Sequence, residues 1–275
     1  MKTTASKTSG FTLVELAIVL VIIGLIIGGV LVGQDLIKAA TIRSTVSDIE
    51  KFNAGATAFR GKYNGLPGDL TSSRAVEFGL SVAADQATGK NAEGVAGARD
   101  GNGVIEGGAA GATTLGGETM LFWRDLGRAG LIAGTYEGGT GSALYPAVAV
   151  TTTNANTFMP RAKLRDTANY YVYSTAGRNW FYIASIAAAT GTGVITPTAA
   201  VTPLEAKGID EKIDDGAPTT GVVLSMTNLT TADPGAAPAT TVCATNATPP
   251  VYNNSSAATG AATNVVCQLQ LRTSF

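Results

Sequence analysis

The feature that most constrains this chain is an apolar run from Phe11 to Gly33, in which Glu15 is the only ionisable side chain. As an α-helix, at about 1.5 Å per residue, the run would be roughly 34 Å long, enough to cross a bilayer core. A cleaved secretory signal would have a shorter apolar stretch of about 7–15 residues, followed by small residues. Because Lys2 and Lys7 precede the run and no acidic residue does, the N-terminus is expected in the cytoplasm. We therefore predict a single-pass anchor with an exported body.

We expect the helix to continue beyond the membrane as an amphipathic segment over residues 34–61. Apolar side chains recur there at steps of three and four, and polar side chains fill the opposite face. The first strong helix breaker is Gly61, and a turn signal follows at Leu66-Pro67-Gly68-Asp69. One helix of about 50 residues is therefore predicted, the alternative being an anchor followed by a separate helix. The apolar stripe consists of Ile42, Val46, Ile49, Phe52, Ala56, Phe59 and Tyr63.

The composition argues against most kinds of enzyme. The chain contains no histidine, which removes the commonest general base, the commonest transition-metal ligand and every Ser-His or Cys-His nucleophile pair. No G-x-S-x-G, P-loop or zinc-ligand spacing occurs. With 19 basic and 20 acidic residues there is no basic field for nucleic acid. We expect a protein that is not an enzyme and does not bind nucleic acid.

The exported body, residues 62–275, is expected to combine strands and helices with long loops. Aromatic-rich runs at 169–174 and 179–185 predict an antiparallel hairpin. A helix with Trp123 partly buried is predicted over 118–132, and a capping box at Thr202 opens a helix that ends at Asp215-Gly216. A strand is predicted over 221–226, and the glycine-rich stretch 94–117 should form no packed element alone.

The residues Gly10-Phe11-Thr12-Leu13-Val14-Glu15-Leu16 resemble the prepilin cleavage and methylation motif of type IV pilins and type II secretion pseudopilins. The resemblance implies that a prepilin peptidase removes residues 1–10 by cutting between Gly10 and Phe11, and that Phe11 is N-methylated. Residues 11–33 would then form the membrane-spanning half of the helix. In that family the carboxylate at the position of Glu15 neutralises the N-terminal amine of a neighbouring subunit. The alternative is that Glu15 lies among the cytoplasmic headgroups.

The resemblance implies an α+β, pilin-like fold, with one long N-terminal helix packed on an antiparallel sheet. It also implies a minor or specialised structural subunit of a type IV pilus or a type II secretion pseudopilus. Its partners would be other pilin subunits, the prepilin peptidase, an assembly platform and ATPase, and membrane lipid before assembly. The expected location is the bacterial inner membrane with a periplasmic body, then a surface pilus or a periplasmic pseudopilus. The alternative function is a membrane-anchored binding module, such as a pilus-tip adhesin or an uptake minor pilin.

The only two cysteines, Cys243 and Cys267, lie near the C-terminal end. The predicted anchor places them outside the cytoplasm, where disulfides persist. Pilins often close a C-terminal loop with a disulfide, so we expect these two residues to be bonded, the alternative being two free thiols. The bond would close the loop 243–267.

Oxygen atoms at alternate positions from Asp100 to Glu106 are typical of calcium loops. Asp100, Asn102 and Glu106 would supply side-chain oxygens and Val104 a carbonyl. The alternative is a polar glycine turn, and no other cofactor is expected. A second acidic group is expected on the solvated face and last turn of the 202–215 helix: Asp210, Asp214 and Asp215.

Overall fold

The computed structural model describes residues 12–80, 99–107, 117–136, 150–175, 177–189, 195–226, 243–245, 249–253 and 265–275. The chain divides into two units, Met1–Thr41 and Ile42–Phe275, and each is described by itself. The helix α1, Leu13–Tyr63, contributes residues to both units. The prediction of one continuous helix is therefore confirmed. The helix passes through Gly61, the predicted breaker, and ends two residues later.

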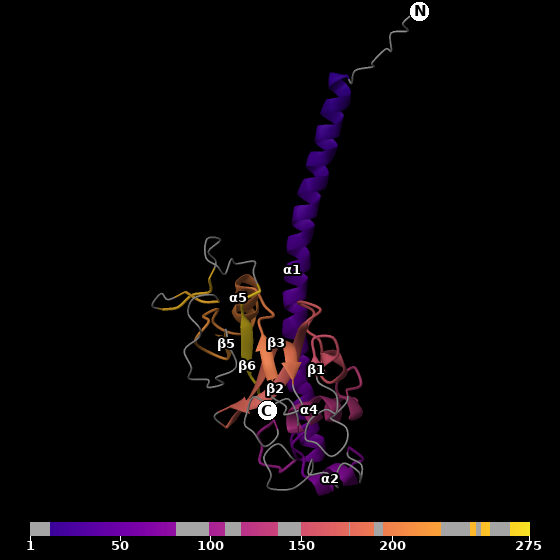
Figure 1. Ribbon diagram of the computed structural model, residues 1–275, viewed down its shortest axis with the longest axis vertical. Coiled ribbons are helices and arrows are strands. Elements are labelled where there is room, and N and C mark those ends of the chain that lie inside the picture. The colour runs from indigo at the N-terminus through magenta and orange to yellow at the C-terminus, as the bar shows by residue number, and fades with distance from the viewer. Residues whose placement is uncertain are drawn as a thin grey trace, which may run out of the picture. The chain divides into compact units, whose positions relative to one another are not determined.

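The second unit is built on a six-stranded antiparallel sheet (Figure 1). β3, Arg178–Ala189, is the central strand. β2, Ala168–Thr175, and β1, Val150–Thr151, pair with successive parts of one edge of β3. β6, Gln268–Arg272, and β4, Ile195–Thr198, pair with its other edge, and β5, Val223–Met226, pairs with β6. The predicted hairpin is present as β2 and β3, with Thr175 opposite Arg178 across the turn.

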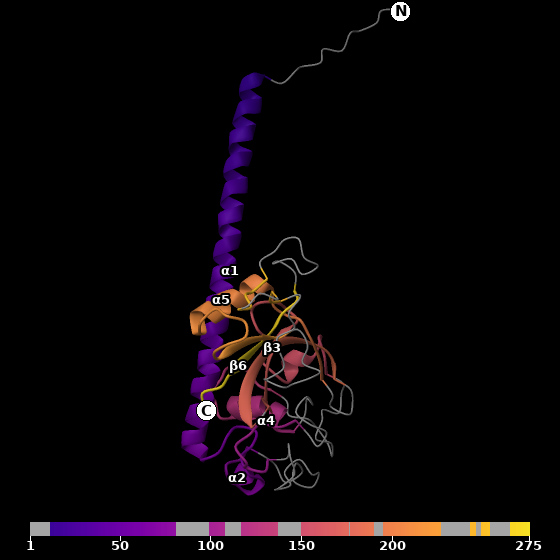
Figure 2. The ribbon, with the colours of Figure 1, turned by 90° about the vertical axis from the view of Figure 1, so that its left-hand side faces the viewer.

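Four helices accompany α1 and the sheet in the described part of the chain. They are α2, Ser72–Glu77; α4, Gly117–Arg128; a 3₁₀ turn, Ala155–Thr157; and α5, Pro203–Ile213. In both views of the body, α5 and α2 lie toward opposite ends of the sheet (Figures 1 and 2). Together with α1 and the antiparallel sheet, these elements confirm the predicted α+β layout.

The core lies where the second half of α1 meets the sheet and α4. The ring of Phe52 is 4.9 Å from Trp123 and 5.1 Å from Tyr170, in edge-on contacts. Trp123 also lies 6.0 Å from Phe181 and is fully buried, so the prediction of a partly buried Trp123 was wrong. Its indole contacts Phe52 of α1, Phe181 of β3 and its own helix neighbour Phe122, and these rings together cover it from solvent.

Several predicted element ends differ from the observed ones for local reasons. α4 ends at Arg128 rather than at 132, because Gly130 adopts a left-handed conformation and the N–H of Leu131 donates to the carbonyl of Leu126. The capping box at Thr202 is present, and α5 ends at Ile213, two residues before the predicted end. The predicted strand 221–226 begins at Val223, after Gly221 with a positive φ.

Candidate functional site

The first turn of α1 holds Glu15, the predicted assembly residue, on an exposed surface. The backbone N–H and the hydroxyl of Thr12 both donate to Glu15 Oε2, at 2.8 and 2.7 Å, and the N–H of Glu15 donates to Thr12 Oγ1 at 3.2 Å. This reciprocal pair is a capping box, and it places a carboxylate at the positive end of the helix dipole. The T-x-x-E spacing was the signal for this box, and our sequence analysis did not use it. Gly10 and Phe11 lie outside the described residues.

Beyond Glu15, the first half of α1 exposes large apolar side chains on every side of the helix. By length and composition α1 can cross a membrane, and none of its most apolar window is buried within the chain. A helix that is apolar all round requires lipid or other helices around it. The exposed fractions of its large apolar side chains range from 45% to 87%, in Leu13, Val14, Leu16, Ile18, Val19, Leu20, Val21, Ile22, Ile23, Leu25, Ile26, Ile27, Val30, Leu31, Val32, Leu36 and Ile37.

The second half of α1 buries one face in the body. Five of the seven stripe residues are buried, Ile42 and Val46 are only partly buried, and Thr45 is buried although it is not in the stripe. Gly55 also lies in this face, and a Cβ there would be 3.4 Å from Ile132 Cγ2 and 3.5 Å from the carbonyl oxygen of Leu131. A Cβ at these distances would be in ordinary van der Waals contact, so this part of α1 packs directly against the segment after α4. The second half of α1 is therefore part of the body core.

The turn that follows α1 is fixed to α4 through a buried ion pair. Gly68 has a φ of +84°, and its N–H donates to Asp125 Oδ2 at 2.9 Å. The other carboxylate oxygen of Asp125 lies 2.7 Å from the guanidinium of Arg99, and both side chains are fully buried. One carboxylate thus connects the turn, α4 and the segment around Arg99. Neither Arg99 nor Asp125 was singled out by the sequence analysis.

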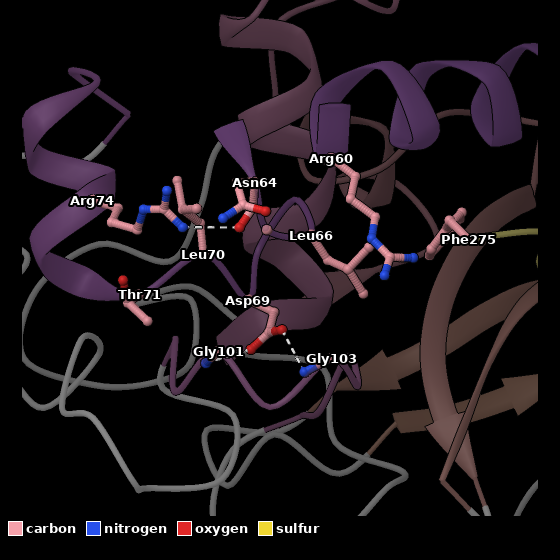
Figure 3. A pocket seen from close by; sticks show the side chains of 11 residues that line it. Arg60, Asn64, Leu66, Asp69, Leu70, Thr71, Arg74, Gly101, Gly103 and Phe275 are labelled. Atoms are coloured by element: carbon pink, nitrogen blue, oxygen red, sulfur yellow. Dashed lines mark hydrogen bonds between the residues drawn. The ribbon is translucent and has the colours of Figure 1, made fainter. Parts of the chain in front are cut away.

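Asp69, the last residue of the Leu-Pro-Gly-Asp turn, holds the loop 100–103 by its backbone (Figure 3). Its Oδ1 accepts hydrogen bonds from the N–H groups of Gly101 and Asn102, at 2.7 and 3.2 Å, and its Oδ2 accepts one from Gly103 at 2.8 Å. The Asp69 side chain is almost completely buried. Burial raises its pKa to about 7, although the backbone donors act in the opposite direction.

Glu118, in the first turn of α4, binds the same loop from the other side. Its Oε1 accepts from the N–H groups of Arg99 and Asp100, at 2.9 and 3.3 Å, and its Oε2 accepts from Glu106 at 2.9 Å. Burial raises the pKa of Glu118 to about 9, and the negative charge of Asp69 adds to the effect. Residues 99–107 of the glycine-rich stretch form no helix or strand, yet two buried carboxylates hold them in place.

The predicted calcium ligands do not all lie together in the structure. Asp100 lies in a group with Asp69 and Glu118, whose carboxylate oxygens are all within 4.8 Å of one another. Asn102 is not free to turn its oxygen toward that group, because its Oδ1 accepts the N–H of Val104 and its amide donates to Asp100. The side chain of Glu106 does not belong to the group. Three carboxylates could hold a divalent cation, so calcium binding stays a prediction, now on a different set.

The C-terminal segment is fastened at two points. Cys243 and Cys267 form a disulfide, with their Cα atoms 5.2 Å apart. The hydroxyl of Tyr252, in the loop that the disulfide closes, donates to Asp210 Oδ2 at 2.8 Å. Asp210 is fully buried, so the prediction that it lies on a solvated face was wrong. The backbone of Gly216 also donates to Asp210, which turns the residue toward the inside of the α5 terminus.

Burial raises the pKa of Asp210 to about 6. Asp215, by contrast, is exposed as predicted, and hydrogen bonds from Thr220 and from the N–H of Ala217 hold the pKa of its carboxyl below the usual value. Asp214 is half-buried and accepts the N–H of Val222. The end of α5 therefore presents Asp215 as a stable negative charge, whereas Asp210 is buried and accepts hydrogen bonds from Tyr252 and Gly216.

Comparison with known proteins identifies the N-terminal segment. Residues 5–31 match the family model of the prokaryotic N-terminal methylation motif, the prepilin-type signature of type IV pilins and pseudopilins. No curated protein and no solved structure matches the chain significantly. The match covers the predicted cleavage site, Glu15 and most of the apolar run, and it leaves the body without a matched relative.

Proposed function

We propose that this chain, which carries the prepilin-type signature, is a minor or specialised structural subunit of a type IV pilus or a type II secretion pseudopilus. The observation that carries the proposal is the difference in exposure between the two halves of α1. The signature leads directly into a helix whose first half exposes apolar side chains all round, and whose second half forms part of the body core. Such a helix can leave lipid only for a place among other apolar helices, which is what a filament centre provides.

Processing would create the group that Glu15 binds. Cleavage between Gly10 and Phe11 frees an α-amine, and methylation leaves its positive charge in place. A carboxylate within a membrane helix is unfavourable even near the end of the span, and a neighbouring subunit's amine would offset this cost inside the filament. Before assembly, the hydrogen bonds from Thr12 satisfy the carboxylate within the same helix. Glu15 would therefore exchange an intramolecular partner for one on the next subunit.

The processing step is tested by the intact mass of the protein extracted from membranes, in cells with and without the prepilin peptidase. We expect the mass in peptidase-containing cells to fall by residues 1–10 and to rise by one methyl group. An identical mass in the two strains would overturn the proposal. Shearing filaments from the cell surface then separates the two systems, because a pilus subunit is recovered in the sheared fraction and a pseudopilus subunit stays in the periplasm.

The assembly role is tested by Glu15→Ala, with Thr12→Val as the matched variant. Both substitutions remove the capping box, worth about 1 kcal/mol of helix stability, but only Glu15→Ala removes the carboxylate. We expect Glu15→Ala to abolish incorporation into filaments while the membrane pool persists, and Thr12→Val to be incorporated. Equal incorporation of Glu15→Ala and wild type would show that the protein is only tethered by α1. Equal loss in both variants would assign the effect to the helix cap.

A further inference from the structure

A pocket of about 320 Å³ lies in the body, at the C-terminal end of α1 (Figure 3). Two arginines line it, Arg60 from the last turn of α1 and Arg74 from α2. The apolar side chains of Leu66 and Leu70 line the space between them, and Phe275 lies beside Arg60. The pocket therefore presents two guanidinium groups within a mixed polar and apolar lining, which suits a carboxylate on a short side chain.

The two guanidinium groups keep most of their hydrogen-bonding capacity. The side chain of Arg60 is exposed and forms no hydrogen bond or ion pair with the described residues. The guanidinium of Arg74 donates only through Nη1, to the carbonyl of Asn64 at 2.9 Å. Asp69 also lines the pocket, but the backbone N–H groups of the loop 100–103 occupy both of its oxygens. No carboxylate among the described residues is thus paired with either arginine.

The opposite end of the same unit carries an exposed carboxylate. α5 lies beside the start of the packed half of α1, because a Cβ on Gly208 would contact Ile42. From Ile42 to Arg60 there are 18 residues of helix, or about 27 Å along the axis. The turn after α5 presents Asp215, exposed and kept ionised by its hydrogen bonds, with the half-buried Asp214 beside it.

We propose that the Arg60–Arg74 pocket receives the acidic turn after α5, at Asp215, from a second copy of this chain. Two copies displaced along the α1 axis by about the height of the body would bring the two arginines of one copy against Asp215 of the next. Because the two surfaces differ, the contact is heterologous, and its repetition generates an open helical array rather than a closed dimer. The inference rests on the proposed function and adds to it a contact between the bodies, separate from the contact made by Glu15.

The test is charge reversal in the full chain, measured as incorporation into purified filaments. Arg60→Glu should lower incorporation about tenfold, since a like charge would then face the acidic turn. Lys62→Glu is the matched control, because it makes the same charge change in the same helical turn but does not line the pocket. Asp215→Arg should also lower incorporation, and Arg60→Glu combined with Asp215→Arg should restore it. The melting temperature of each variant establishes that its body is folded.

A second measurement does not depend on the charges. All described cysteines are in the disulfide, so Arg60→Cys and Asp215→Cys introduce the reactive pair. Oxidation of filaments that carry both substitutions should give a ladder of covalent multimers, and neither single variant should do so. No ladder, together with no rescue in the charge-reversed pair, would overturn the pocket proposal while normal processing and wild-type incorporation leave the proposed function standing. A wild-type chain absent from filaments would instead refute the proposed function.

Discussion

Removing Arg99 should destabilise the body more than any exposed charge can. The guanidinium of Arg99 lies 2.7 Å from Asp125 Oδ1, and neither side chain has any exposed surface. Arg99→Met leaves the buried carboxylate of Asp125 without its main partner, and such losses cost about 3–5 kcal/mol. A domain of this size is stabilised by only about 5–15 kcal/mol in total. The substitution should therefore remove a large part of the free energy of unfolding.

The assay is thermal unfolding of a fragment that begins at residue 36. All members of the hydrophobic core lie in the unit Ile42–Phe275, so the fragment keeps the complete core. For a domain of this length, 1 kcal/mol corresponds to about 2–4 °C, and a loss of about 4 kcal/mol lowers the melting temperature by about 8–16 °C. Arg161→Met is the control, because its pair with Asp166 is largely exposed and should contribute less than about 1 kcal/mol.

A double variant separates the ion pair from its surroundings. Arg99→Met combined with Asp125→Leu removes both charges. The remaining cost comes from the N–H of Gly68 and the carbonyl of Leu70, which lose their buried partners, at about 1–3 kcal/mol for each unsatisfied group. We expect the double variant to be more stable than Asp125→Leu alone. The reasoning fails if Arg99→Met has the same melting temperature as the Arg161→Met control. It also fails if the cost of the double variant equals the sum of the costs of Arg99→Met and Asp125→Leu.

Two further predictions use the same fragment. Gly68→Ala should lower the free energy of unfolding by about 3 kcal/mol, because φ is +84° and the new Cβ would lie 2.9 Å from the backbone nitrogen of Phe122. Gly61→Ala is the control: its Cβ meets open space, so it should not destabilise the protein. The folded protein raises the pKa of Asp210 from 3.8 to about 6, so the stability that its protonated form contributes is complete below about pH 4 and is lost as the pH rises through 6. The free energies of unfolding of wild type and Asp210→Asn, obtained from melting curves at each pH, should therefore diverge over this range by up to about 3 kcal/mol. The same pH dependence in both proteins would contradict the assignment.

The elements that the sequence predicted well are those whose signal is periodic and local. Steps of three and four residues placed Phe52 and Phe59 on the buried face of α1, and the structure confirms them, whereas Ile42 and Val46 at the start of the stripe are only partly buried. The aromatic runs predicted β2 and β3, whose short turn brings the two strands together with little loss of chain entropy. The capping box of α5 was predicted from four consecutive residues.

The predictions that failed concern residues whose environment is supplied by distant segments. Asp210 was predicted on a solvated face, because nothing within α5 indicates that Tyr252 lies against it. Trp123 was predicted to be only partly buried, because the helix pattern does not show that Phe52 covers the indole. Calcium binding stays a prediction; its ligands were chosen among neighbours of Asp100 along the chain, whereas the carboxylates nearest in space come from the turn after α1 and from α4.

The sequence by itself determined the long helix, its apolar half and the signature before it, because helical period, membrane-spanning length and a short motif are all properties of consecutive residues. Only the tertiary structure decided which charges meet. Arg99 pairs with Asp125, which is 26 residues away in the sequence, and Asp69 binds the N–H of Gly101, which is 32 residues away. Burial makes the pairing of such groups necessary, but it does not choose the partner. That choice depends on how the turn after α1, the loop and α4 pack together, and no local pattern records it.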